Sequence, residues 1–175
     1  LPVAAKRPTL MPNLEGDYPA YFIFGPLVFS TPTSQVFATT TSAALRTVQL
    51  FSLLSRSGSP LVTRWHEEPA FPDEELVMVS STMFPHRLGR GYSSPMLRVV
   101  KDINGTVIKN LTHLVEVLRD LQDEFVIFNF HGIGAPPIVL PRAEAVSATE
   151  EILNDNGVRA QASPNLLAIW DPAKK

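Results

Sequence analysis

The sequence predicts an α+β fold, because strand-like and helix-like hydrophobic patterns follow one another within a chain of 175 residues. The clearest pattern spans residues 95–130. It contains Asn104-Gly105, a dipeptide that readily takes the positive φ angles of a two-residue hairpin turn. A helical stripe follows this turn, and residues 125–130 then alternate as a strand does. The stretch is therefore predicted to be strand, turn, strand, helix and strand.

The predicted helix of this stretch has apolar side chains at intervals of three, four and seven residues. They are Leu111, Leu114, Val115, Leu118 and Leu121. This spacing places them on one face of a helix and predicts that the face is buried. His113 and Val117 are four residues apart, so they lie together on a different face.

Composition excludes several classes of function. A hydrophobic fraction of 45% is sufficient for a core, and a formal net charge of −2 gives no reason to expect a nucleic-acid partner. The absence of cysteine excludes disulfides, zinc–thiolate sites and a cysteine nucleophile. The most apolar run, residues 18–29, is too short to span a bilayer, so membrane insertion is not expected.

The first part of the chain changes character twice. Residues 1–17 are rich in proline and are predicted to be a linker from a preceding domain, which makes the chain a fragment of a longer protein. A strand is predicted next, broken by Gly25-Pro26. Because proline cannot donate to a sheet ladder, this break is expected at an edge or bend, where backbone groups can be free for a ligand.

A helical pattern occupies residues 34–55, with its boundary expected near Ser42 because the preceding threonine cluster disfavours helix. It belongs to a predicted insert at about residues 34–75. A short buried strand is predicted at residues 76–80 and a loop at residues 84–94.

The C-terminal part is predicted to contain one more helix. Ser147 and Glu150 match a capping box, and Gly157 is well placed to end the helix. The main domain is therefore expected to span residues 18–162. Residues 163–175 are predicted to form a loosely ordered tail, in which a few apolar side chains could dock.

A search for catalytic patterns finds none. The four histidines, at positions 66, 86, 113 and 131, show no metal-ligand spacing. The sequence lacks a Gly-x-Ser-x-Gly nucleophile motif and a glycine-rich phosphate loop before a helix. No catalytic residue, metal or cofactor is therefore predicted for this chain.

Three motifs in order carry a resemblance to a known family. They are YFIFGPLVFSTPT, then RGYSSPMLRVVKDINGTVIKNLTHL, and finally DEFVIFNF with IVLPRAEAVSATEEILNDNGV. Together they cover the chain from about Tyr18 to Leu166. This pattern is similar to the C-terminal PDZ-like domain of Deg/HtrA (protease Do-like) serine proteases.

The resemblance implies a small, partly open β-barrel or sandwich with flanking helices, a helical insertion and a helical C-terminal extension. It implies that the chain is non-catalytic, and that the catalytic domain of an ATP-independent serine endopeptidase for protein quality control lies upstream. A periplasmic or organellar location would fit this family, but the targeting region is not in the chain. The sequence departs from the family where Gly25-Pro26 replaces Gly-Gly, which makes a carboxylate-binding role for that loop doubtful.

Two functions of different class follow from these observations. The first is oligomer assembly and regulation of the protease through protein contacts, with the groove filled by the insert or the N-terminal segment. Its interface candidates are Phe37, Leu50, Phe51 and Leu54. They are apolar residues of the insert, too many for one narrow helix stripe.

The alternative is peptide binding by β-augmentation, in which a peptide adds as a strand between residues 27–30 and the helix of residues 111–121. Its groove candidates are Phe24, Gly25, Leu27, Val28, Phe29, His113 and Val117. In this hypothesis His113 donates to a peptide hydroxyl and Val117 shapes an apolar pocket. The simpler interpretation, which we favour, is that His113 is a solvated residue early in the helix and Val117 a contact at its rim.

Overall fold

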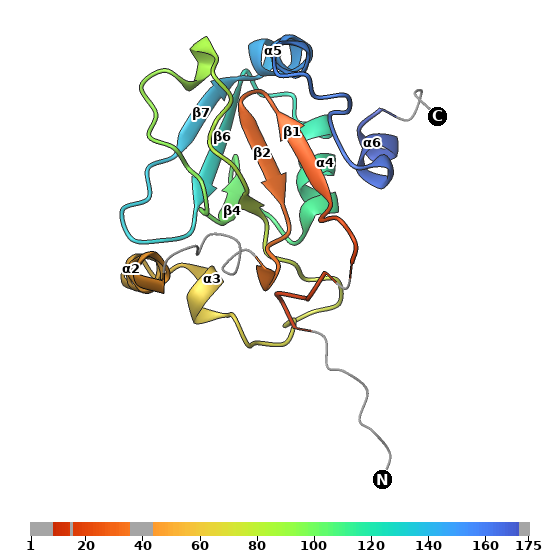
Figure 1. Cartoon of the computed structure of the whole chain (residues 1–175). Coiled ribbons are helices and arrows are strands. Elements are labelled where there is room, and N and C mark those ends of the chain that lie inside the picture. The colour runs from red at the N-terminus through yellow and green to blue at the C-terminus, as the bar shows by residue number, and fades with distance from the viewer. Residues whose placement is uncertain (1–8, 15, 36–43, 172–175) are drawn as a thin grey trace.

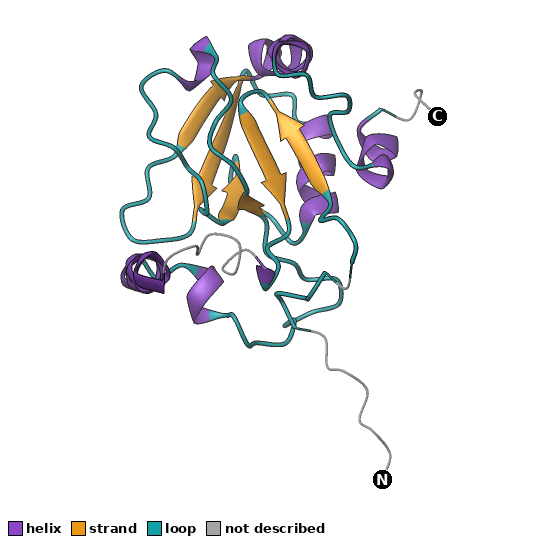
Figure 2. Ribbon diagram, in the orientation of Figure 1, coloured by secondary structure: helices purple, strands orange, loops and turns teal. Residues whose placement is uncertain are grey.

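The computed structural model describes residues 9–14, 16–35 and 44–171, and Figures 1 and 2 show how their strands and helices are arranged. The first sheet is antiparallel and has the order β1-β2-β3. Its strands are β1 (Tyr21–Phe24), β2 (Leu27–Ser30) and β3 (Met78–Val79). The predicted break at Gly25-Pro26 is thus the tight turn between β1 and β2, with Phe24 opposite Leu27.

The second sheet is also antiparallel, with the order β5-β4-β6-β7. Its strands are β4 (Val100–Ile103), β5 (Thr106–Val107), β6 (Phe125–Phe130) and β7 (Ile138–Pro141). Asn104 and Gly105 both have positive φ, at 49° and 84°, and form the predicted hairpin turn between β4 and β5. The Asn104 amide also binds the backbone of β6, donating to the Phe125 carbonyl (2.9 Å) and accepting from the Ile127 N–H (2.7 Å).

The two sheets meet at one corner and stay apart at the other. At the joined corner, the Val100 N–H donates to the Val77 carbonyl (2.8 Å) and the Val79 N–H to the Arg98 carbonyl (3.0 Å). On the opposite side, β1 and β7 do not pair within the described residues, and helix α5 (Arg142–Asp155) contacts both of them. The structure is therefore an open barrel, as predicted for an α+β fold of this kind.

The remaining helices lie at three places around the sheets (Figure 1). Helix α4 (Leu111–Asp120) packs against β1 and β4, and helix α6 (Pro164–Trp170) packs on α4. At the end of the molecule away from α5 lie α2 (Ala44–Arg56) and α3 (Pro60–Thr63), which belong to the predicted insert. A short 3₁₀ turn, η1 (Arg87–Gly89), interrupts the loop before β4.

The described residues pack into two separate hydrophobic clusters. The main cluster lies between the sheets and beneath α4, and it includes the buried face of α4 predicted from the leucine spacing: Leu111, Leu114, Val115 and Leu118. The second cluster lies under the insert and joins Leu54 and Leu61 to Met78 and Met11. The insert thus has a small core of its own, attached to the domain through β3.

Three predictions about element limits need correction. Helix α5 starts at Arg142 rather than at Ser147, whose hydroxyl donates to the Glu144 carbonyl (3.1 Å) inside the helix. The predicted loose tail is wrong over residues 164–170, which form α6. Leu166, one of the apolar side chains predicted to dock, is buried in the main cluster. The strand predicted at residues 76–80 is shorter, and residues 36–43 of the predicted insert helix lie outside the described residues.

Candidate functional site

The candidate site is the outer edge of β1, beside helix α4. One edge of β1 pairs with β2, so its other edge offers backbone N–H and C=O groups to another segment. In this structure residues 160–163 of the same chain lie along that edge, and we call them the docked segment. Phe22 forms an antiparallel bridge with Ala162 at its centre.

Two backbone hydrogen bonds join the docked segment to β1. The Ile23 N–H donates to the Gln161 carbonyl (2.9 Å), and the Ser163 N–H donates to the Tyr21 carbonyl (3.0 Å). The segment runs antiparallel to β1, so its C-terminal end lies at the beginning of that strand. This geometry is strand addition, with the chain itself supplying the added strand.

Three side-chain hydrogen bonds strengthen the same contact. The Tyr21 N–H donates to Ser163 Oγ (3.0 Å), Gln161 Nε2 donates to the Ile23 carbonyl (3.0 Å), and the Tyr21 hydroxyl donates to the Ala160 carbonyl (3.1 Å). They leave the polar groups of this edge paired, which matters because unpaired buried backbone groups are costly.

Beyond the docked segment the chain enters α6, which covers the adjoining part of the core. The Trp170 ring lies edge-on to Phe22 at 5.2 Å and to Phe24 at 6.2 Å between centroids. Arg119 of α4 donates from Nη1 to the Ile169 carbonyl (3.1 Å). The edge of β1 beside α4, where the predicted peptide groove would lie, is therefore covered by the chain's own C-terminal part and not by the insert or the N-terminal segment as predicted.

The structure corrects which strand borders the groove. A peptide was expected beside residues 27–30, but β2 lies between β1 and β3 and has a partner at both edges. Among the predicted groove residues, Phe24, Leu27 and Phe29 are fully buried in the main cluster, and Val28 is partly buried. They form the wall of the core behind the groove rather than its surface.

The turn at Gly25-Pro26 does not offer free backbone groups either. The Gly25 N–H donates to Thr149 Oγ1 of α5 (2.9 Å), whose hydroxyl in turn donates to the Ala145 carbonyl (2.7 Å). The Pro26 carbonyl accepts from the Phe84 N–H (2.9 Å). This turn is a buried junction with α5, so the expectation of ligand-binding backbone groups there is wrong.

The two helix residues predicted to border the groove have structural contacts of their own. The ring atom Nδ1 of His113 accepts from the Lys109 N–H (3.3 Å). The backbone N–H of His113 donates to the side chain of Asn110, the N-cap of α4 (2.7 Å). Val117 is partly buried and packs against the main cluster. Whether either side chain meets a ligand remains a prediction.

The predicted interface residues fall into different environments. Leu54 is buried in the second cluster, and Leu50 packs against it. Phe51 stays 40% exposed, with its ring 5.9 Å from that of Trp65, and Phe37 lies outside the described residues. On the same helix Val48 and Leu53, each 65% exposed, are the more accessible apolar side chains.

An open cavity of about 770 Å³ adjoins the docked segment at the start of β1. Tyr18, Tyr21 and Ser30 line one side of it, and Ala160, Ser163 and Leu167 line the other. Sequence patterns did not predict this site, because residues 160–163 show neither strand alternation nor β-branched side chains.

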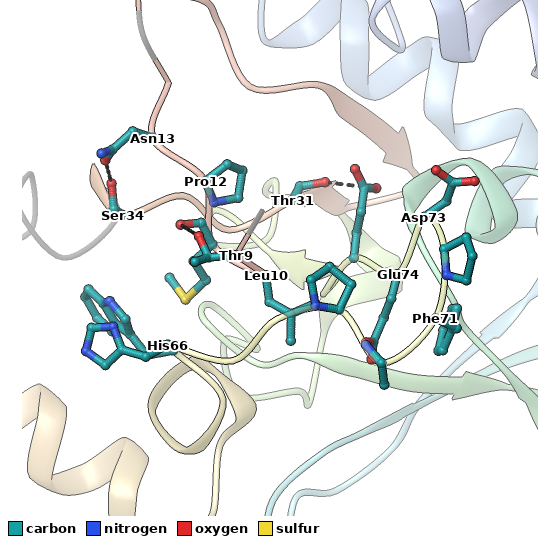
Figure 3. Close-up of a pocket in the computed structure, with 16 residues that line it drawn as sticks. Thr9, Leu10, Pro12, Asn13, Thr31, Ser34, His66, Phe71, Asp73 and Glu74 are labelled. Carbon is teal, nitrogen blue, oxygen red and sulfur yellow. Dashed lines mark hydrogen bonds between the residues drawn. The ribbon is translucent and has the colours of Figure 1, made fainter. Parts of the chain in front are cut away.

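A second cavity, of about 1060 Å³, lies between residues 9–13 and the loop of residues 65–75 (Figure 3). Two of the carboxylates that line it, those of Glu74 and Glu75, make contacts within the fold. Glu74 pairs with Arg64 (2.6 Å), and Glu75 accepts from the Leu111 N–H at the start of α4 (3.3 Å). Glu74 thus holds two parts of the insert together, and Glu75 joins the insert to α4.

The Arg64–Glu74 pair predicts a pH dependence of stability. The hydrogen bonds from Arg64 hold the pKa of Glu74 below its usual value of 4.5, against the opposing effect of burial. A carboxyl group whose pKa is lowered by folding stabilises the folded protein at pH values above its ordinary pKa. This stabilisation is lost as the pH falls through the pKa of the folded state. We expect Glu74→Gln to be less stable than the wild type at pH 7, with the difference shrinking below about pH 4.

Urea unfolding at a series of pH values measures this effect. Glu150→Gln, which alters an exposed carboxyl group on α5, is the matched control and should show no such pH-dependent difference. If the free energies of unfolding of Glu74→Gln and the wild type differed by the same amount from pH 7 to pH 3, the prediction would be contradicted.

Within the described residues, no cluster of three or more His, Asp or Glu side chains is arranged to hold a metal ion. Over the same part of the chain, no helix combines the length and apolar character needed to cross a membrane.

An open antiparallel barrel whose outer strand holds an extended segment beside a helix defines the class of strand-addition modules. Comparison with known proteins specifies the class further. A family model described as "PDZ domain" matches residues 12–165, so the chain belongs to the PDZ domain family. It is also similar to "Protease Do-like 2, chloroplastic" of Arabidopsis thaliana, with 27% identity over 172 residues.

The second match covers 97% of this chain but 26% of the relative, so the chain spans about a quarter of that protein's length. The predicted resemblance to a PDZ domain of the Deg/HtrA family is thereby confirmed. A PDZ domain is a binding module rather than a catalytic one.

Proposed function

We propose that this PDZ domain serves the assembly and regulation of a Deg/HtrA-like serine protease whose catalytic domain lies elsewhere in the protein. The occupied edge of β1 is the observation that supports this proposal most directly. A groove filled by its own chain is less available to free peptides. This favours a function that uses other surfaces of the domain. Partners in this proposal are other copies of the domain or the protease domain itself.

The insert offers a surface for such contacts. Its helix α2 buries Leu54 against the second cluster but leaves Val48 and Leu53 mostly exposed on its flanks. Exposed apolar side chains of this size are common at protein–protein interfaces. The docked segment and this helix lie at different places on the domain, so assembly does not require the groove to open.

We expect the wild type to self-associate with increasing concentration and the double variant Val48→Lys/Leu53→Lys to shift toward the monomer. Two lysines would place like charges at a contact between copies and raise the cost of burying it. Sedimentation velocity over a concentration series measures the shift. Val107→Lys on β5, a position 63% exposed, is a control of matched exposure and should associate like the wild type. A wild type that is monomeric throughout would count against assembly.

The second candidate function is peptide binding by β-augmentation. It is favoured by the edge of β1 itself, since the five hydrogen bonds described above show that this edge can hold an extended chain. Panning a peptide library against the domain tests this function. Enrichment of a defined peptide by a strictly monomeric domain would favour binding over assembly.

A further inference from the structure

We propose that the groove between β1 and α4 recognises an internal stretch of polypeptide, with a small apolar residue between polar ones, rather than a free C terminus. This inference rests on the second function proposed above and names its ligand class. The docked segment Ala160–Ser163 is the model for the ligand, since it already occupies the site.

The first reason is that the bound chain continues past the end of the groove. Ser163 lies at the start of β1, and Pro164 follows it as the first residue of α6. The helix then packs on α4 and places Trp170 against Phe22. A ligand that ended at the position of Ser163 would lose the whole of this second contact.

The second reason is the absence of a carboxylate-binding arrangement at the start of β1. The Tyr21 N–H, the first amide of the strand, already donates to Ser163 Oγ. Pro19, two residues before the strand, has no N–H to offer a carboxylate. Among the described residues that line the cavity there, none is Lys, Arg or His. A terminal carboxylate at this place would therefore find no cationic side chain among these residues.

The third reason is the close packing around Ala162, at the centre of the docked segment. Ala162 is 2% exposed and forms the bridge with Phe22, a residue fully buried in the main cluster. A larger side chain at this position would have to displace packed neighbours, which is costly in a close-packed interior. Gln161 and Ser163, on either side of it, both make side-chain hydrogen bonds to β1. The ligand pattern is therefore polar, small, polar.

An external ligand must compete with the docked segment. Because the segment is tethered, it acts at a high effective concentration and lowers the apparent affinity of any competitor. Ser163→Pro removes the two hydrogen bonds between Ser163 and Tyr21, the one that the Ser163 N–H donates and the one that its Oγ accepts. Weakening the tethered segment in this way should open the groove to the same sequence added as a separate peptide.

The experiment uses the full chain and three fluorescent peptides of wild-type sequence. One is residues 157–171, acetylated and amidated, and the other two are residues 157–163 with either an amidated or a free C terminus. We expect the long peptide to bind Ser163→Pro roughly ten-fold or more tightly than it binds the wild type. We expect the free carboxylate of the short peptide to give no gain over the amide.

Two further measurements keep the result interpretable. Asn165→Ala, at an exposed position of α6, should bind the long peptide as the wild type does. Gln161→Ala removes one side-chain hydrogen bond and serves in place of Ser163→Pro if that variant does not fold. Exchange of the Ile23 amide hydrogen, which donates to the Gln161 carbonyl, should be faster in either variant than in the wild type.

Tighter binding of the free-acid peptide than of its amide would overturn the proposal, since the groove would then read C termini. Equal, undetectable binding of every peptide to a variant with an exposed Ile23 amide would also overturn it. Neither outcome bears on the proposed assembly function, which sedimentation of the Val48→Lys/Leu53→Lys variant tests separately.

Discussion

Replacing Phe128 with alanine is expected to lower the free energy of unfolding by about 3–5 kcal/mol. Phe128 lies in the centre of β6 and is fully buried. Its ring stacks on that of Phe29 at 5.3 Å and meets Phe24 edge-on at 6.2 Å, so it joins the two sheets across the core. Removing the ring leaves a cavity that the rigid sheets cannot close, which adds to the lost transfer free energy.

The same substitution at Phe125 is the matched control. Phe125 begins the same strand but is 43% exposed, so Phe125→Ala should cost about 1 kcal/mol or less. Urea unfolding followed by tryptophan fluorescence measures both variants, and the slope against urea should stay unchanged if unfolding remains two-state. Equal losses at the two positions would show that the sheets are not joined through Phe128.

The second large effect is expected in the insert. Leu61→Ala should lower the free energy of unfolding by about 2–5 kcal/mol, because Leu61 is fully buried at the centre of the second cluster. Its helix α3 begins at Pro60 with Ser59 as the N-cap, and it holds the insert against Leu76 and Met78. The short helix α3 depends on this packing, since isolated short helices are unstable in water.

Leu53→Ala is the control for this variant, since it makes the same chemical change on the neighbouring helix α2. Leu53 is 65% exposed, so its truncation should change the free energy of unfolding by no more than about 0.5 kcal/mol. Differential scanning calorimetry compares the two variants with the wild type. A Leu61→Ala variant as stable as Leu53→Ala would mean that the insert is not anchored by the second cluster.

Much of the structure of residues 95–130 could be predicted from the sequence because its signals are local. The Asn104-Gly105 turn, the apolar stripe of α4 and the alternation of β6 each depend on residues within one element. The boundaries of α5 were predicted less well. A Ser-x-x-Glu pattern marks a helix start only when the backbone before it is not helical, and here residues 142–146 already are.

The candidate site was predicted only in outline. The sequence predicted a peptide between the helix of residues 111–121 and residues 27–30, whereas the strand of the first sheet that has an outer edge beside α4 is β1. Which strand lies at the edge of a sheet depends on the order of the strands. That order is decided by contacts between segments far apart in the chain, which periodicity does not record.

By itself the sequence determined the family and the face that α4 turns to the core. Only the tertiary structure decided that the edge of β1 is occupied, and by which segment. Tyr21 and Ser163 are 142 residues apart, and Gly25 and Thr149 are 124 apart. Such contacts form because backbone groups at an edge must find partners once the core has assembled. A segment as small and polar as residues 160–163 shows no sign of this role until the strand it completes is in place.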